Sequence, residues 1–241
     1  MFHSIGTAFH PCQDGGMEKK DRRQKGENPL SRERIVREAI ALLDAGGEGG
    51  LTFRALSERL ATGAGAIYWH IADKSDLLTA ACDAVIADAL ATAAAAASPE
   101  QAVRAVAAAL FDTLDEHPWA GTALARAPGQ LPAVRILEAL GQPLMKLGVA
   151  DTVRWPAASA LLGYVLGVGA QNAANAELAQ RQGLDRTRVL NEVAETWAAL
   201  DAQAYPFTCS VAARFADHDD REDFLAGVDL LLDGIRARVS R

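Results

Sequence analysis

Several features that mark other classes of protein are scarce in this chain of 241 residues. Aromatic residues make up only 6% of it, β-branched residues form few runs, and no stretch alternates between polar and apolar residues. Such alternation is the pattern of a half-buried strand, so its absence argues against a β-sheet. Half of the residues are hydrophobic, chiefly alanine and leucine, and the chain is long enough to bury one large or two modest cores. We therefore expect an all-α protein.

The few cysteines argue against a disulfide framework and against a metal centre. Cys12, Cys82 and Cys209 are far apart and odd in number, and their spacing fits neither kind of site. This usage predicts a reducing, cytoplasmic location. Cys82 shares a helical face with Leu78 and Val85, which predicts a small core residue. We expect neither a cofactor nor a metal.

Membrane and catalytic signals are also missing from the sequence. Every apolar run is interrupted before it could span a bilayer, and the N-terminus lacks the pattern of a signal peptide. There is no nucleophile elbow, P-loop, metal constellation or pair of catalytic carboxylates, and His117 and His218 have no evident partners. The sequence therefore predicts neither a membrane protein nor an enzyme.

Residues 51–76 carry the clearest positive signal. Thr52 is suited to cap a short helix whose apolar face repeats at helical spacing, and Gly63 is suited to start a second one. Asp73, with Asp76 three residues later, is typical of the start of a third helix. Two short helices joined by a tight turn form the helix-turn-helix pattern, in which the second helix enters the DNA major groove. The alternative is an ordinary corner between helices in a helical domain.

This stretch resembles the DNA-binding domain of the TetR/AcrR family of bacterial transcriptional regulators. The matching residues are Leu51, Thr52, Arg54, Leu56, Ser57, Ala66, Ile67, Tyr68, Trp69, His70, Ile71, Lys74, Leu77 and Leu78. The resemblance is strong over residues 31–90, whereas the remainder matches in helical character and in its last helix. It implies a three-helix DNA-binding head over residues 29–75 and an effector-binding and dimerisation body over residues 76–241. It also implies that residues 74–95 act as a lever between the two.

The resemblance implies a set of DNA contacts. Thr52, Arg54, Tyr68, His70 and Lys74 are expected at phosphates, with Arg54 also near a base edge. Trp69, by contrast, is expected in the core.

The positions that read bases depart from the family pattern. Ala64, Gly65 and Ala66 offer no bidentate hydrogen bonds, although they allow contact with a thymine methyl group. The sequence therefore predicts reliance on Arg54, DNA shape and backbone contacts. Ala61 replaces the usual turn glycine, which predicts a strained turn.

The charge is unevenly distributed along the chain, whose net charge is −7. Residues 19–76 hold eleven basic against nine acidic residues, whereas the rest hold thirteen against twenty-two. This asymmetry suits a DNA-facing head on an acidic body. Residues 1–28 are expected to be disordered. Their basic cluster is either an arm that touches DNA or a solvated tail, and it comprises Lys19, Lys20, Arg22, Arg23 and Lys25.

The body is expected to hold an effector pocket and a dimer interface. Aromatic residues with a few polar groups suit a mostly apolar small molecule, and the scarcity of basic residues there speaks against a strongly anionic one. The candidate pocket residues are Phe111, His117, Trp119, Met145, Trp155, Tyr164, Gln171 and Asn175, of which the apolar ones could equally be core. By resemblance, the dimer interface comes from two helices of each subunit. Its candidates are Gly163, Gly167, Phe224, Val228, Leu231, Leu232 and Ile235.

Two hypotheses from different functional classes remain. The first is a homodimeric repressor that binds a palindromic operator and is released by a small-molecule effector. The second is a helical small-molecule sensor whose head no longer reads a DNA sequence, and the run Ala64-Gly65-Ala66 motivates it.

Overall fold

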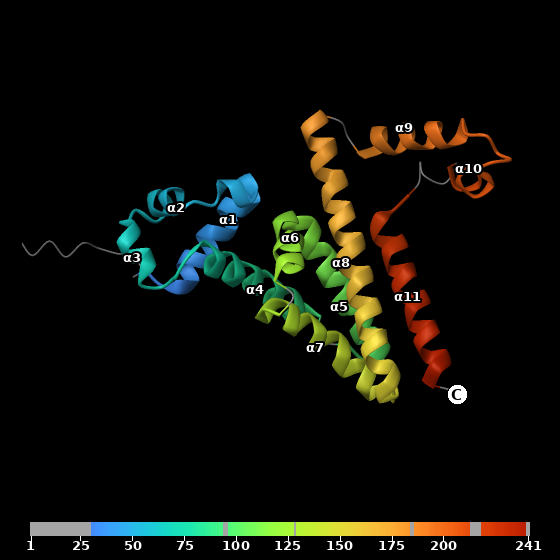
Figure 1. The fold of residues 1–241 in the computed structure, drawn as a ribbon, viewed down its shortest axis with the longest axis horizontal. Helices are drawn as coiled ribbons and strands as arrows, with labels where there is room; N and C mark the ends of the chain where they lie inside the picture. Colours follow the sequence, from blue (N-terminus) through green and yellow to red (C-terminus); the bar gives the residue numbers. More distant parts are fainter. Residues whose placement is uncertain (1–29, 94–95, 128, 184–185, 213–217, 240–241) are drawn as a thin grey trace, which may run out of the picture.

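The structure is a computed structural model that describes residues 30–93, 96–127, 129–183, 186–212 and 218–239. All regular structure within these ranges is helical, as the composition predicts. A small head lies at one end of the molecule, and a larger helical body makes up the rest (Figure 1). The basic cluster at residues 19–25 lies outside the described ranges. Within them, no helix is long and apolar enough to cross a membrane.

Pro29 and Ser31 predict the start of a first helix, and Gly46 and Gly47 predict its end. Helix α1 (Arg32–Gly50) starts there and ends later. The Ser31 hydroxyl accepts a hydrogen bond from the Arg34 amide, which caps its first turn. The expected break at Gly46 and Gly47 is present, since Gly47 has a φ of 59° that favours glycine. One further turn follows the break. The buried face of α1 consists of Ile35, Val36, Ala39 and Leu43.

Helices α2 (Phe53–Leu60) and α3 (Ala64–Tyr68) form the predicted helix-turn-helix. Thr52 caps α2 by accepting a hydrogen bond from the Ala55 amide at 3.1 Å. In the turn, Ala61 has a left-handed backbone (φ 51°, ψ 42°), and no other non-glycine residue in the described ranges has a positive φ. Because a Cβ is strained in this region, the predicted strain at Ala61 is confirmed.

Helix α4 (Lys74–Thr92) leads from the head into the body (Figure 1). The Asp73 carboxylate caps it by accepting from the Asp76 amide at 2.8 Å. Leu77 at its start and Ile86 further along are both fully buried, so one helix contributes to the packing of the head and of the body. Cys82 is buried on this helix as predicted, and its burial raises the pKa of the thiol to about 12.

The body is built around α5 (Pro99–Glu116), α6 (Pro118–Arg126), α7 (Leu131–Lys146), α8 (Asp151–Gln182) and α11 (Asp220–Val239). Helix α5 packs against α4, α7, α8 and α11, so it forms the centre of this domain. Ser98 followed by Pro99 predicts a helix start, because serine caps a helix and proline favours its first position, and α5 begins there. The short helices α9 (Arg186–Ala198) and α10 (Pro206–Ala212) lie against each other beyond the end of α8 (Figure 1).

An aromatic cluster joins α5, α8 and α11. The Phe224 ring stacks on Phe111 with centroids 4.7 Å apart and on Tyr164 at 5.4 Å. The Tyr164 hydroxyl donates to the Phe224 carbonyl at 3.1 Å. Helix α11 approaches this hydroxyl so closely that a Cβ at Gly227 would lie 1.9 Å from it. A side chain at Gly227 would therefore displace the Tyr164 ring from this crossing.

Candidate DNA-binding surface and ligand cavities

The predicted DNA contacts lie on and around the exposed side of α2 and α3. Thr52, Arg54 and Tyr68 are exposed, and a shallow hollow of about 500 Å³ runs between the two helices. Its walls include Arg54 and Ala64, so the guanidinium of α2 and the start of α3 border the same surface. This is the arrangement that a helix-turn-helix offers to a DNA groove.

Two of these side chains are held by neighbours on α2. The Arg54 guanidinium pairs with the Glu58 carboxylate one turn later, at 3.0 Å, and both side chains are largely exposed. Such a pair is weak, so it leaves Arg54 available to a phosphate. The Tyr68 ring stacks on Phe53 with centroids 4.6 Å apart, which leaves its hydroxyl end at the surface.

Arg32 anchors the turn between α3 and α4. It donates to the His70 carbonyl and pairs with the Asp76 carboxylate at 2.7 Å. The Arg32 guanidinium and then the Ala72 amide lower the pKa of Asp76, because both favour its charged form. His70 is half-buried beside this anchor. The last predicted contact, Lys74, donates its ammonium to the Glu48 carbonyl at 2.6 Å.

Trp69 corrects the sequence-based interpretation. It is 89% exposed, whereas we expected it in the core. Ile67 and Ile71 are both buried, so one helical face is already filled, and Trp69 points away from it. The four-residue spacing of the two isoleucines was the signal that identifies the buried face.

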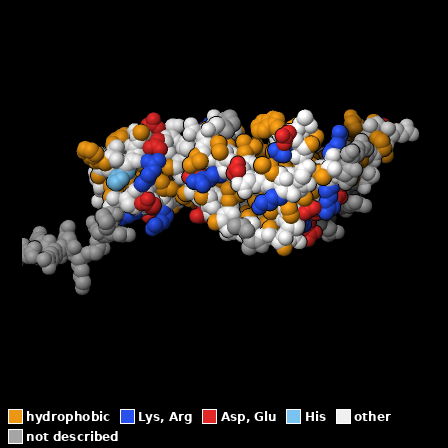
Figure 2. Space-filling view, turned by 90° about the horizontal axis from the view of Figure 1, so that it is seen from below, with side chains coloured by type: hydrophobic (Ala, Val, Ile, Leu, Met, Phe, Trp, Pro, Cys, Tyr) orange, Lys and Arg blue, Asp and Glu red, His pale blue; other side chains and the backbone are white. Residues whose placement is uncertain are grey.

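The base-reading positions form a smooth surface. Ala64 and Gly65 are exposed and Ala66 is half-buried. Figure 2 shows hydrophobic side chains at the tip of the head. On the side of the molecule that is seen in this figure, basic side chains stand among acidic ones. The start of α3 thus presents no polar side chain to a base.

Five of the eight predicted pocket residues are not among those that line the cavity between α8 and α11. Met145 and Trp155 are 57% and 66% exposed, so their side chains face solvent. Phe111 belongs to the aromatic core, and the Trp119 indole donates to Asp44 of the head at 2.7 Å. His117 lies beside Trp119 and contacts the same carboxylate, with its Nδ1 2.7 Å from Asp44 Oδ1. The residues that begin α6 therefore connect the body to the head.

The other three pocket residues converge on one cavity. Tyr164, Gln171 and Asn175 of α8 line a space of about 270 Å³ between α8 and α11, with Leu190 of α9 at its wall. Phe224 supplies an apolar floor, and the remaining lining is mainly polar. That lining includes Asn172, His218, Asp220 and Asp223, and His218 contacts both aspartates at 2.8 Å. Although most of the lining residues are polar, apolar atoms make up the larger part of the exposed lining, so the cavity suits a mostly apolar ligand that carries a few hydrogen-bonding groups.

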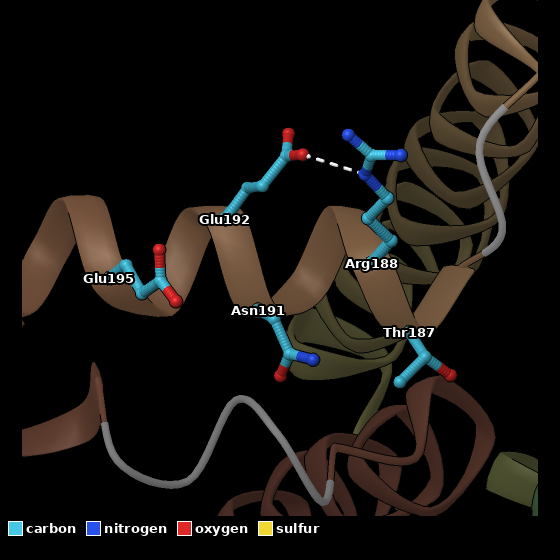
Figure 3. A pocket seen from close by; sticks show the side chains of 5 residues that line it. All are labelled: Thr187, Arg188, Asn191, Glu192 and Glu195. Atoms are coloured by element: carbon cyan, nitrogen blue, oxygen red, sulfur yellow. Dashed lines mark hydrogen bonds and ion pairs between the residues drawn. The ribbon is translucent and has the colours of Figure 1, made fainter.

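A further hollow follows α9 alone. Figure 3 shows its lining residues, with Glu192 and Arg188 paired at 3.1 Å and turned away from the side to which Asn191 points. All five lining residues belong to α9: Thr187, Arg188, Asn191, Glu192 and Glu195. Among the described residues only α9 lines this hollow, whereas three helices line the cavity between α8 and α11.

The candidate dimer residues divide into two groups. Gly163 and Gly167 are exposed on α8, and a Cβ at either would meet nothing within 4 Å. The candidates on α11 face inward instead: Phe224, Val228, Leu232 and Ile235 are buried in the same chain, and Leu231 is half-buried. These residues form the most apolar stripe of α11, and the helix uses this stripe to pack on α5 and α8. Leu230, 74% exposed, lies on its outer face.

These features define a class: a helix-turn-helix protein with a separate helical body. A family model for bacterial regulatory proteins of the tetR family matches residues 35–81, and one for the Tetracyclin repressor-like C-terminal domain matches residues 97–239. Because the second match alone covers more than half of the chain, the protein belongs to the TetR family.

Individual relatives agree with this assignment. The solved structure of a TetR transcriptional regulator from Streptomyces coelicolor is 52% identical, with 87% of this chain and 99% of that chain covered and a TM-score of 0.80. Solved structures also include BioQ from Mycobacterium smegmatis and BioQ with its natural double-stranded DNA operator. The BioQ chain bound to the operator is 26% identical, with 87% of this chain and 99% of that chain covered and a TM-score of 0.58. A curated HTH-type transcriptional regulator from Saccharopolyspora erythraea is 32% identical over 139 residues, 57% of this chain, and the chain spans 59% of its length.

Proposed function

We propose that this protein is a homodimeric transcriptional repressor that binds a palindromic DNA operator and leaves it when a small molecule binds the body. The observation that carries the proposal is the exposed helix-turn-helix surface, on which Arg54 borders the start of α3 and Tyr68 ends this helix. The operator bound by the related BioQ supports the same mode of binding.

On DNA, α3 would enter the major groove while α2 crosses the backbone. Thr52, Arg54, Tyr68, His70 and Lys74 would meet phosphates and fix the register, while Ala64, Gly65 and Ala66 allow close approach to thymine methyl groups. Sequence preference would then rest on Arg54 and on DNA shape.

A second copy would pack on the outer faces of α8 and α11. Gly163 and Gly167 on α8 permit a close helix approach, and Leu230 adds exposed apolar area on α11. Two heads held in this way would read half-sites roughly 34–36 Å apart. Gly163→Arg should give a monomer in sedimentation, whereas Lys146→Gln on α7 should leave a dimer.

The effector would enter the cavity between α8 and α11. Tyr164, Gln171 and Asn175 would bind its polar groups over the Phe224 ring. Occupation would favour the arrangement of heads that no longer matches the operator. We also propose that the protein is not an enzyme and acts in the cytoplasm, as regulators of this family do.

The test is fluorescence anisotropy on the DNA upstream of the protein's own gene, beside a scrambled duplex and across a salt series. Preference for the native duplex, lost in Arg54→Ala and kept in Lys146→Ala, is the expected result. Equal, weak and strongly salt-dependent binding to both duplexes would contradict it. That outcome would favour a helical sensor without operator specificity, the alternative suggested by the smooth surface of Ala64 and Gly65.

A further inference from the structure

A separate cavity of about 310 Å³ lies where the head meets the body. Its walls come from the end of α1, the first half of α4, the end of α6 and the start of α7. The volume is at the low end of the range of about 300–1,000 Å³ for small-molecule pockets. Head and body both contribute to it, so an occupant would contact the two domains at once.

The cavity is amphipathic. Leu78, Cys82, Leu124 and Pro132 give it an apolar interior, and the last three are buried. Cys82 stays uncharged because its burial raises the pKa of the thiol to about 12. This interior suits an aliphatic or aromatic body rather than a polar one.

The rim of the cavity carries positive charge. Arg126 and Lys74 both reach Glu48: the guanidinium lies 2.6 Å from its carboxylate, and the ammonium donates to its backbone carbonyl at 2.6 Å. The rim thus holds two cations and one carboxylate: Arg126 pairs with the Glu48 carboxylate, whereas Lys74 makes no ion pair with a described acidic residue. An anionic group arriving here would replace a neutral carbonyl as the partner of Lys74.

We propose that this junction cavity binds a small amphipathic carboxylic acid, with its tail against Leu78 and Leu124 and its carboxylate against Lys74 and Arg126. The regulatory consequence rests on the proposed function, in which Lys74 contacts an operator phosphate. An acid that holds Lys74 removes this contact and fastens α4 to α6. By thermodynamic linkage, operator DNA weakens binding of the acid by the same factor as the acid weakens binding of DNA.

The experiment compares three probes that share one tail: octanoate, octanol and octylamine, titrated calorimetrically into the full chain without DNA. Octanoate is expected to bind at least tenfold more tightly than the other two, a difference of about 1.4 kcal/mol.

The variant Lys74→Gln should weaken the binding of octanoate by a similar factor. Lys146→Gln, a change of the same kind on the exposed end of α7, should not. Cys82→Met, which narrows the interior, should weaken all binding, with thermal melting used to verify that it folds.

Equal binding of octanol and octanoate, unchanged affinity in Lys74→Gln, or no binding of octanoate would each overturn the proposal. Anisotropy on operator DNA is measured in parallel with the same samples. Operator binding without octanoate binding would refute the junction site and leave the repressor standing. Octanoate binding that depends on Lys74, without operator binding, would leave the site standing and refute the repressor.

Discussion

The Trp119 indole donates a 2.7 Å hydrogen bond from the body to the Asp44 carboxylate of the head. Trp119 is only 6% exposed, so its N–H would lose its partner in Asp44→Ala. Leaving a buried donor unsatisfied costs about 1–3 kcal/mol. We expect Asp44→Ala to lower the free energy of unfolding by an amount in this range and to change DNA affinity, because it loosens the head. Urea denaturation and anisotropy measure the two effects. Asp88→Ala, an exposed change on α4, should have neither.

Replacement of Ala61 by glycine is predicted to stabilise the protein. Its left-handed backbone carries a cost of about 1–2 kcal/mol for a residue with a Cβ. Ala61→Gly should therefore stabilise the head by about 1 kcal/mol. Ala84→Gly, inside helix α4, should destabilise it by about 0.5–1 kcal/mol. Thermal melts of Ala61→Gly and Ala84→Gly should shift in opposite directions; a drop in both would contradict the strain argument.

Gly227 is predicted not to accept a side chain. A Cβ there would lie 1.9 Å from the Tyr164 hydroxyl and 2.5 Å from its Cζ, so the stacked Tyr164 ring would have to move. Overpacking of this kind costs about 1–3 kcal/mol. Gly141→Ala on α7 meets nothing within 4 Å and should be neutral or stabilising by up to about 1 kcal/mol. Equal stability of Gly227→Ala and Gly141→Ala in denaturant would contradict the close approach of α11 to Tyr164.

The pairing of Asp76 with Arg32 predicts an acid-sensitive head. Since the pKa of folded Asp76 is lowered, its contribution to stability is complete above the ordinary aspartate pKa of about 3.9. It is lost as the pH falls from there through the lowered value. Asp76→Asn should be less stable at neutral pH and should lose less stability on acidification. Denaturation across this pH range measures both, and parallel curves for the two proteins would contradict the prediction.

Glu58 is predicted to restrain Arg54. Their exposed pair at 3.0 Å competes with a phosphate for the guanidinium. Glu58→Ala should raise DNA affinity, mainly at low salt, since it also removes a negative charge from the surface. Arg54→Ala should lower DNA affinity. The slope of the logarithm of the binding constant against the logarithm of the salt concentration should become less steep by about 0.9 for each lost phosphate contact. Salt titrations of operator binding test both, and unchanged slopes in Arg54→Ala would place this residue away from the backbone.

Much of the architecture followed from local sequence. The caps at Ser31, Thr52, Asp73 and Ser98 lie where predicted, because a cap depends on neighbours within a few residues. The strain at Ala61 was also predictable, since it follows from one missing glycine. The helical class and the family motif needed no knowledge of distant contacts.

What lies across a helix–helix contact depended on the tertiary structure. Trp69 faces solvent and the apolar stripe of α11 faces its own core, because a sequence shows that a face is apolar but not what covers it. The same holds for the cavities: Tyr164, Gln171 and Asn175 share one helix and can be grouped from its sequence, whereas Lys74 and Arg126 lie far apart in the chain. Only the packing of α1 and α4 against α6 brings those two charges to one rim. Short-range patterns thus determined the elements, and long-range packing decided which side chains meet.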